Sequence, residues 1–480
     1  MTRNAQFMKT MCTTGARRLG IRVAILCALT LPLLAQFDTG TITGTVTDPS
    51  GAVVPQAAVT IVNTGTSIQR TLQANGSGSF VASAVPFGNY IVSATASGFK
   101  EAKSRTIVLN VGATVNVNLA LSLATSQESI QVTGTLESVD TSSSTSGTTL
   151  DTNQVANLPV NGRDVSSFLE ISPGSVGSTG YFQGSVNGLD NIFTGLNITV
   201  DGQSAMRGDI NGFLDTEGQE GARITRASID SIQEIDYANS GYTAENGHSL
   251  GPQMNIITKS GTNAFHGELF EFLRNDALDA KDYFATTAEP LRLNQFGGNL
   301  AGPIIKGKLF FFVNYEGDRT HVTTILPRNH TLSAYARSQF VPSMQPVLAQ
   351  FAPLPAGCNA IPAPASCVYP GFLDGNDLAT QGSDMVFDPV ALPSIVREDT
   401  GSVRVDYNIS EKDRIFFRYN INDSLTNDTY GANLNQVSPQ ALRTQLGKFD
   451  ETHTFNSTLL NEFSVAINRF YSNVNSNTPQ

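Results

Sequence analysis

The feature that most constrains the fold is an alternation of apolar and polar residues that begins near residue 262. It is clearest in segments 295–300, 309–316, 402–409, 414–421 and 462–467. Because successive side chains of a strand point to opposite faces of a sheet, each segment predicts a strand with one apolar, often aromatic face and one polar face. A membrane β-barrel with lipid outside and water inside requires this arrangement. A soluble sandwich produces the same alternation.

The connections between these segments favour the barrel. Residues 305–307 and 410–413 predict tight turns, whereas residues 317–398 predict a loop of about 80 residues, and outer-membrane barrels combine short periplasmic turns with long extracellular loops. Residues 262–480 hold about seven strands, whereas a plugged transporter barrel has about 22. Seven strands would leave two unpaired edges in lipid. We therefore expect an incomplete antiparallel barrel and a chain that is the N-terminal part of a longer protein.

Composition agrees with export and excludes some partners. Only 15% of the residues are charged, against about 25% in typical soluble domains. The net charge is −11 and the pI is near 5.0, so no nucleic acid is expected as a partner, because phosphate binding needs clustered Lys and Arg. No internal apolar stretch reaches the roughly 18 residues of a transmembrane helix.

The N-terminus predicts a signal peptide over residues 1–35. Basic residues precede an apolar core at 23–34, Ala35 is a plausible cleavage residue, and Gln36 would begin the mature chain. Processing would leave two cysteines, Cys358 and Cys367, which the oxidising periplasm predicts to form a disulfide in the long loop. The alternative is two unrelated thiols. No nearby residues complete a four-ligand zinc site around them.

Residues 36–121 predict a small β-sandwich of about seven short strands separated by turn clusters. In the last strand Val115, Val117, Leu119 and Leu121 face one way. The fragments GTVTD at 44–48, GAVVPQAAV at 51–59 and VPFGNY at 85–90 resemble the carboxypeptidase regulatory-like domain. The resemblance implies a prealbumin-like or carbohydrate-binding-like fold. None of the five histidines begins the His-x-x-Glu pair of a zinc carboxypeptidase, so we expect no enzyme activity, catalytic residue, metal or cofactor.

Residues 122–150 predict a linker, because 141–149 are rich in Ser, Thr and Gly. Just before this stretch, the fragment ESIQVTG at 128–134 resembles a TonB box, the extended segment that adds a strand to the energy-coupling protein TonB. The alternatives are a further local strand and plain linker. The resemblance implies TonB as a partner, with contacts from Glu128, Ser129, Ile130, Gln131, Val132 and Thr133.

Residues 151–261 mix helix and strand signals. Asp164 predicts the N-terminal cap of a short helix that ends near Ile171, before Pro173 and Gly174. The fragments NLPVNGR at 157–163, ISPG at 171–174, NITVDG at 197–202, IDSIQEI at 229–235 and MNIITKSG at 254–261 resemble the α/β plug domain of TonB-dependent receptors. Many of those receptors have an Arg-Gly pair where residues 186–188 read VNG, which is closer to the Oar-like subgroup and leaves the ligand open.

Residues 262–480 resemble the Oar-like transporter barrel in GTNAFHG at 261–267, RND at 274–276, NQFGG at 294–298, GPII at 302–305 and LFFF at 309–312. Residues 302–309 also approach a P-loop, but the final Ser or Thr is missing and a strand follows, so we predict strand–turn–strand. The polar faces of the strands provide candidate residues facing the barrel lumen: Arg404, Asp406, Arg418 and Glu462.

The resemblance implies an outer-membrane receptor that imports a large ligand with energy from TonB. The ligand could be a siderophore, an oligosaccharide or a peptide. Expected partners are TonB, outer-membrane lipid and this extracellular ligand, with the sandwich in the periplasm and the long loop outside the cell. Two other functions stay open. One is a structural or adhesive surface protein in the Oar-like manner, and the other is carbohydrate binding by the sandwich.

Overall fold

The fold is known from a computed structural model and is mainly β, as predicted. The structure describes residues 39–123, 145–158, 160, 163, 165–171, 173–176, 185–186, 189–190, 197–205, 227–242, 251–281, 283, 288–332, 334–344, 346, 359, 385–429, 437–456 and 459–474. All of them belong to one compact unit, residues 37–480. The predicted signal peptide, the TonB-box residues 128–133 and both Cys358 and Cys367 lie outside the described residues.

The N-terminal sandwich has two sheets around an apolar core. One has the order β4-β1-β8 with β9 also paired to β1, and the other has the order β3-β2-β5-β6 with β7 also paired to β5. Val117, Leu119 and Leu121 are buried, as their alternation predicts. The strands are β1 Thr39–Thr47, β2 Ala58–Asn63, β3 Gln69–Gln73, β4 Ser79–Pro86, β5 Gly88–Thr95, β6 Ala102–Lys103, β7 Ile107–Leu109, β8 Thr114–Asn116 and β9 Leu119–Ala120.

The next part, residues 145–258, is called the central segment below. Its main sheet has the order β10-β16-β17-β14-β15, and a small sheet has the order β11-β12-β13. The strands are β10 Ser146–Leu150, β11 Ser175–Val176, β12 Ser185–Val186, β13 Leu189–Asp190, β14 Asn197–Val200, β15 Gln203–Ser204, β16 Ile232–Ser240 and β17 Gln253–Thr258. The helices are α2 Thr152–Asn157 and the 3-10 helices η2 Val165–Ile171 and η4 Ile229–Ser231.

Local sequence explains the helices of the central segment. Asp151 caps α2 through a complete capping box, in which the Gln154 side chain bonds back to the Asp151 N–H. The short helix predicted to end at Ile171 is η2, a 3-10 helix. The central segment has an apolar core that includes Val155, Phe168 and Ile256.

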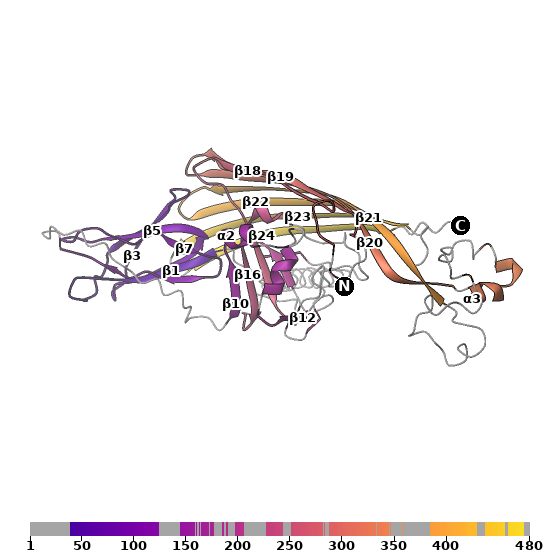
Figure 1. Cartoon of the computed structure of the whole chain (residues 1–480). Coiled ribbons are helices and arrows are strands. Elements are labelled where there is room, and N and C mark those ends of the chain that lie inside the picture. The colour runs from indigo at the N-terminus through magenta and orange to yellow at the C-terminus, as the bar shows by residue number, and fades with distance from the viewer. Residues whose placement is uncertain are drawn as a thin grey trace, which may run out of the picture. The chain divides into compact units, whose positions relative to one another are not determined.

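Seven strands between residues 266 and 474 form an antiparallel sheet in chain order, called the barrel sheet below. Its long strands lie side by side, with the central segment against one face (Figure 1). Residues 302–309 are strand–turn–strand, as predicted. The strands are β18 His266–Asn275, β19 Leu291–Ile305, β20 Leu309–Leu332, β21 Met385–Asn408, β22 Asp413–Thr429, β23 Val437–Asn456 and β24 Leu459–Val474.

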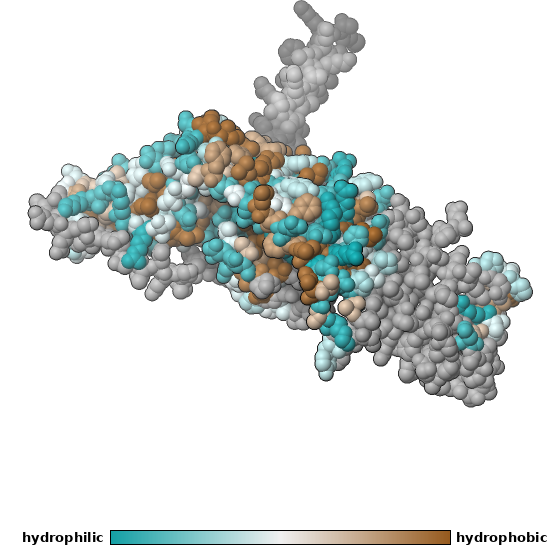
Figure 2. Space-filling model, turned by 45° about the horizontal axis from the view of Figure 1, so that its top comes forward, coloured by the Kyte–Doolittle hydropathy of each residue, from teal (hydrophilic) through white to brown (hydrophobic). Residues whose placement is uncertain are grey.

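The two faces of the barrel sheet differ in the way the alternation predicts. Phe417, Phe449 and Val465 are exposed on one face, and hydrophobic surface is visible over the strands in Figure 2. Arg404, Asp406 and Arg418 on the other face are buried. No helix among the described residues has the length and apolar character that crossing a membrane requires.

The long loop is shorter than predicted at both ends. β20 runs on to Leu332 and β21 begins at Met385, so the connection spans 333–384 and includes α3 Ala334–Gln339 and η5 Pro342–Met344. The strands pair from Leu309 with Tyr407 to Leu332 with Met385. The alternation fades after Glu316, but an antiparallel ladder is made of backbone hydrogen bonds and does not need it.

Candidate functional site

The site is a network of buried charges between the central segment and the barrel sheet, centred on Asp201. Asp201 and Gly202 form the tight turn between β14 and β15, and both have positive φ, 45° and 73°. Asp and Gly tolerate that backbone conformation, which two-residue hairpin turns require. The turn points the carboxylate back onto β17, where its Oδ1 accepts from the Thr258 N–H at 2.9 Å and its Oδ2 from the Thr258 hydroxyl at 2.8 Å.

Two arginines of the barrel sheet flank this carboxylate. Arg404 on β21 and Arg418 on β22 are direct partners in the strand register. Arg404 Nη1 lies 3.3 Å from Asp201 Oδ1, and Arg418 Nε lies 3.3 Å from Asp201 Oδ2. All three side chains are at most 1% exposed. The central segment is therefore joined to the sheet by ion pairs that water does not screen.

Further groups balance the arginines. Asp406 accepts two hydrogen bonds from Arg404, through Nε and Nη2 at 3.0 Å each, and one from the Ser260 hydroxyl at 2.7 Å. The ring of Phe416 lies under the Arg404 guanidinium, with 4.5 Å from Cζ to the ring centroid. Two-pronged hydrogen bonds and an aromatic face are the contacts that favour Arg over Lys in a buried pair.

A second anchor on the same turn comes from β23. Lys448 Nζ donates to the Asp201 backbone carbonyl at 2.8 Å and lies 3.2 Å from Asp450 Oδ2. Arg418 Nη2 donates to Gln203 Oε1 at 2.6 Å, and Gln203 Nε2 donates to the Ile467 carbonyl at 2.9 Å. Strands β21, β22, β23 and β24 thus all contact the turn at 201–203.

The electrostatics hold Asp201 in its ionised form. Burial by itself would raise the pKa of this carboxyl, but Arg404, Arg418 and the two hydrogen bonds from Thr258 together lower it below its ordinary value. Removing any one charge leaves its partners buried without an opposite charge. This costs far more stability than replacing the whole ion pair by apolar side chains. The complete network therefore stabilises the contact between the central segment and the barrel sheet, and most of this stabilisation is lost when one member moves away.

Contacts away from Asp201 also join the central segment to the barrel sheet. The Ser228 hydroxyl donates to Glu316 on β20 at 2.5 Å, and both side chains are buried. Arg163 pairs with Asp230 at 2.5 Å, and its guanidinium lies over the rings of Phe270 and Phe272 on β18. Burial raises the pKa of Asp230, and Arg163 opposes that rise.

Three of the four residues predicted to face a barrel lumen meet in this network: Arg404, Asp406 and Arg418. Glu462, on β24, is partly exposed and lies opposite Thr452. Sequence reasoning missed Asp201, Gln203, Lys448 and Asp450. Asp201 lay within the NITVDG fragment that resembles a plug, and β23 was not predicted at all.

Residues 257–480 match the family described as outer membrane beta barrel domain, and residues 41–122 match the carboxypeptidase regulatory-like domain. A sheet that is apolar on one face and buries charge on the other, together with these matches, defines an outer-membrane β-barrel protein.

The particular class follows from a relative. The chain is 26% identical over 296 residues to the TonB-dependent transporter Oar of Myxococcus xanthus, which covers 58% of this chain and 26% of that transporter. Together with both domain matches, this relative supports a likeness of the chain to the Oar-like TonB-dependent receptors of the outer membrane. The chain spans about a quarter of the length of this relative.

Solved structures are also similar. The siderophore receptor PirA from Acinetobacter baumannii matches with a TM-score of 0.36 and 15% identity, over 68% of this chain and 44% of that one. The outer membrane transporter YddB from Escherichia coli matches with a TM-score of 0.40 and 10% identity, over 64% of this chain and 37% of that one.

Proposed function

We propose that this chain is the gated entrance of a TonB-dependent importer, in which the central segment is a plug that closes the barrel. The buried network around Asp201 is the observation that supports this most. A plug must stay seated against the barrel wall and yet be released when pulled. Ion pairs that lose most of their free energy once a single partner moves provide such a contact.

The pulling element would be the segment at 128–133, which precedes the central segment in the chain. An extended peptide that adds a strand to TonB would transmit force through residues 134–145 to β10. β10 pairs with β16 through residues 146–150, and β16 pairs in turn with β17, which contains Thr258. Force applied to β10, at the edge of this sheet, would therefore pass through β16 to β17 and to Thr258, which donates hydrogen bonds to Asp201.

The ligand would be large and would bind from outside, where the connection at 333–384 and the plug would meet it. Its class, siderophore, oligosaccharide or peptide, stays a prediction. The proposal includes no catalytic step, cofactor or nucleic acid.

TonB coupling is tested by cysteine cross-linking in outer membranes. The full-length protein would have Ile130→Cys, with Cys358→Ser and Cys367→Ser to remove competing thiols. We expect a disulfide-linked product with TonB carrying a cysteine in its C-terminal domain. The matched control is Val108→Cys, a position 62% exposed on the sandwich, which should give no product. Equal yields, or no product at 128–134, would favour a structural or adhesive surface protein.

Plug closure is tested by permeability. Asp201→Asn leaves the shape of the turn but removes the charge that holds Arg404 and Arg418. We expect cells with this variant to admit a vancomycin-sized antibiotic that the wild type excludes. Asp423→Asn, an exposed aspartate on β22, is the control and should leave the membrane closed. Unchanged exclusion by Asp201→Asn would show that the central segment does not seal the barrel.

A further inference from the structure

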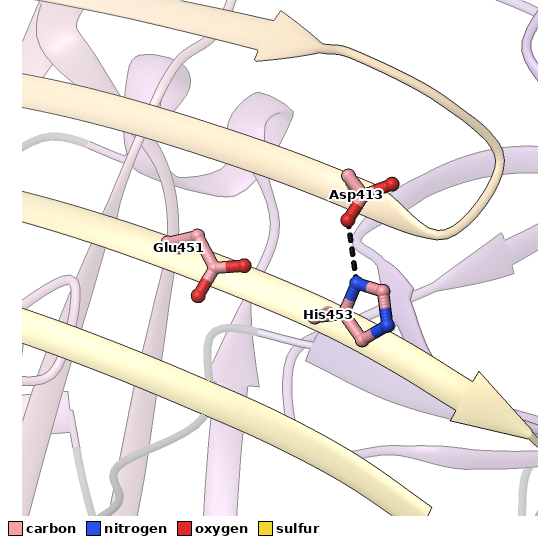
Figure 3. Close-up of side chains that lie close together, drawn as sticks. All are labelled: Asp413, Glu451 and His453. Carbon is pink, nitrogen blue, oxygen red and sulfur yellow. Dashed lines mark hydrogen bonds and ion pairs between the residues drawn. The ribbon is translucent and has the colours of Figure 1, made fainter.

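Three potential metal ligands meet on the apolar-facing side of the barrel sheet, away from the Asp201 network. Asp413 begins β22, and Glu451 and His453 lie on β23. In the register, Asp413 is opposite His453 and Ile415 is opposite Glu451. Because residues i and i+2 of a strand share a face, all three side chains project to the same side (Figure 3). One ligand atom from each lies within 4.8 Å of the others.

The contacts within the cluster orient His453 and Asp413 toward each other. His453 Nδ1 lies 2.5 Å from Asp413 Oδ1, and the His453 ring stands edge-on to Phe455 with 4.3 Å between centroids. The contact with Asp413 directs the imidazole toward β22, and Phe455 on β23 packs against the ring. Within the described part of the chain, no hydrogen bond or ion pair engages the Glu451 carboxylate, so its oxygens are available.

A continuous strand ladder holds the backbone around the cluster. β22 and β23 pair continuously from Asp413 with His453 to Thr429 with Val437. On the Asp413 side, the Ser410 hydroxyl donates to Asp413 Oδ2 within the tight turn that precedes β22. Ligands mounted on paired strands hold their spacing better than ligands on a loop.

We propose that Asp413, Glu451 and His453 bind a divalent transition-metal ion of the zinc class. One imidazole nitrogen and two carboxylate oxygens suit zinc, whereas calcium and magnesium prefer oxygen alone. Three protein ligands leave a fourth tetrahedral position for water. Binding requires the Nδ1–Oδ1 distance to open to about 3.3 Å, the separation of two ligands in a tetrahedral zinc site. A rotation of the Asp413 side chain provides that movement.

Metal binding at this site is independent of ligand import. The three side chains lie on the apolar face of the barrel sheet, beside the turn at 409–412. This is the end of the sheet opposite the connection at 333–384. A metal there would fasten β22 to β23 beside the turn at 409–412. The sequence alone does not predict this site, because Asp413 and His453 are forty positions apart in the chain. They become neighbours only through the strand register.

Isothermal titration of the purified full-length protein in detergent with ZnCl₂ tests the proposal. We expect saturable binding of about one ion per chain, weakened at least tenfold by His453→Gln and by Glu451→Gln. The matched control is His321→Gln, which removes an exposed histidine of the same sheet and should not change this binding. Circular dichroism would confirm that each variant is folded.

Cobalt gives an independent readout. Co²⁺ should produce the visible absorption of a tetrahedral nitrogen–oxygen site in the wild type and in His321→Gln, and the band should disappear in His453→Gln. Equal zinc affinity in the wild type and His453→Gln, or no saturable binding in either, would overturn the proposal.

Discussion

The sandwich and the contact between the central segment and the barrel sheet are buried by opposite means. The sandwich encloses apolar side chains such as Ile42, Val59 and Val92, each fully buried. The contact around Asp201 encloses ions, with Arg404 and Arg418 among the largest fully buried side chains of the described chain. Apolar burial is non-directional and survives small displacements, whereas a buried ion pair depends on its partner staying in place.

These two kinds of burial predict different mobility for the two regions. A core of eighteen buried apolar residues gives the sandwich its own source of stability. The central segment also has an apolar core, but its attachment to the barrel sheet is mainly ionic and polar, and Leu446 is the one residue of the sheet in that core among the described residues. If the central segment is the proposed plug, it would leave the barrel sheet with its own apolar core intact.

Disrupting the ionic contact should destabilise the protein most. Asp201→Asn keeps the turn and a hydrogen-bond acceptor but leaves two arginines without their carboxylate. Loss of one partner of a buried pair costs about 3–5 kcal/mol. Hydrogen exchange measured by mass spectrometry should show faster exchange in peptides covering 197–205 and 253–258, with the sandwich unchanged.

A double mutant distinguishes the network from a general loss of packing. Asp201→Asn leaves Arg418 buried without its carboxylate, and adding Arg418→Gln removes this uncompensated charge. The destabilisation of the double variant should therefore be smaller than the sum for the two single variants. Additive effects would mean that Asp201 and Arg418 do not interact in solution.

The next effect concerns pH and the contact of the central segment with the sandwich. The Val111 N–H donates to Glu234 Oε1 at 2.8 Å. Burial, assisted by the charge of Asp236 and opposed by this hydrogen bond, raises the pKa of Glu234 from 4.5 to about 7. The folded state therefore holds a proton that the unfolded state has lost, and stability falls as pH rises from 4.5 to about 7.

Glu234→Gln should remove that fall. The variant should match the wild type near pH 4.5 and exceed it at pH 8, by about 3 kcal/mol if the whole shift is expressed. Thermal melts of the full-length protein in detergent across this range would measure it. Parallel pH profiles for the two proteins would contradict the assignment of the titration to Glu234.

A smaller effect tests the apolar side of the comparison. Gly44 of β1 faces the Val117 carbonyl, and a Cβ there would lie 1.9 Å from that oxygen and 2.6 Å from the Phe80 ring. Gly44→Ala should force β1 from its neighbours and cost about 2 kcal/mol by overpacking. Gly76→Ala is the control, since a Cβ there meets nothing within 4 Å. Faster exchange confined to residues 39–123 is expected, with the Asp201 turn unaffected.

The sequence predicted the parts of the fold that repeat locally. Period-two alternation located five strands of the barrel sheet and the faces of Arg404, Asp406 and Arg418, because lipid and charge separate across a strand. The alternation did not locate β23, because the residues at its outward positions Arg443, Gln445 and Gly447 are not apolar. The Asp151–Gln154 capping box was present in the sequence as a start signal for α2 and went unused.

The site could be predicted only in part, because its geometry is long-range. Asp201 meets Arg404 and Arg418 across some two hundred positions, and no local pattern specifies that pairing. The fragment at 197–202 indicated a plug-like turn, and the strand faces indicated inward arginines. What joined them was the docking of one sheet against another, which follows from packing of the whole unit.

The smallest effect is expected where an ion pair stays in water. Arg443 Nη2 lies 2.6 Å from Asp423 Oδ2, closer than either arginine lies to Asp201, yet both side chains are 52% exposed. Solvent screens such a pair, and ordering two long side chains offsets most of the attraction. Asp423→Asn and Arg443→Gln should therefore leave exchange of β22 and β23 within the scatter of the measurement, at low and at high salt. A loss comparable to that of Asp201→Asn would show that distance, and not burial, decides the strength of ion pairs on this sheet.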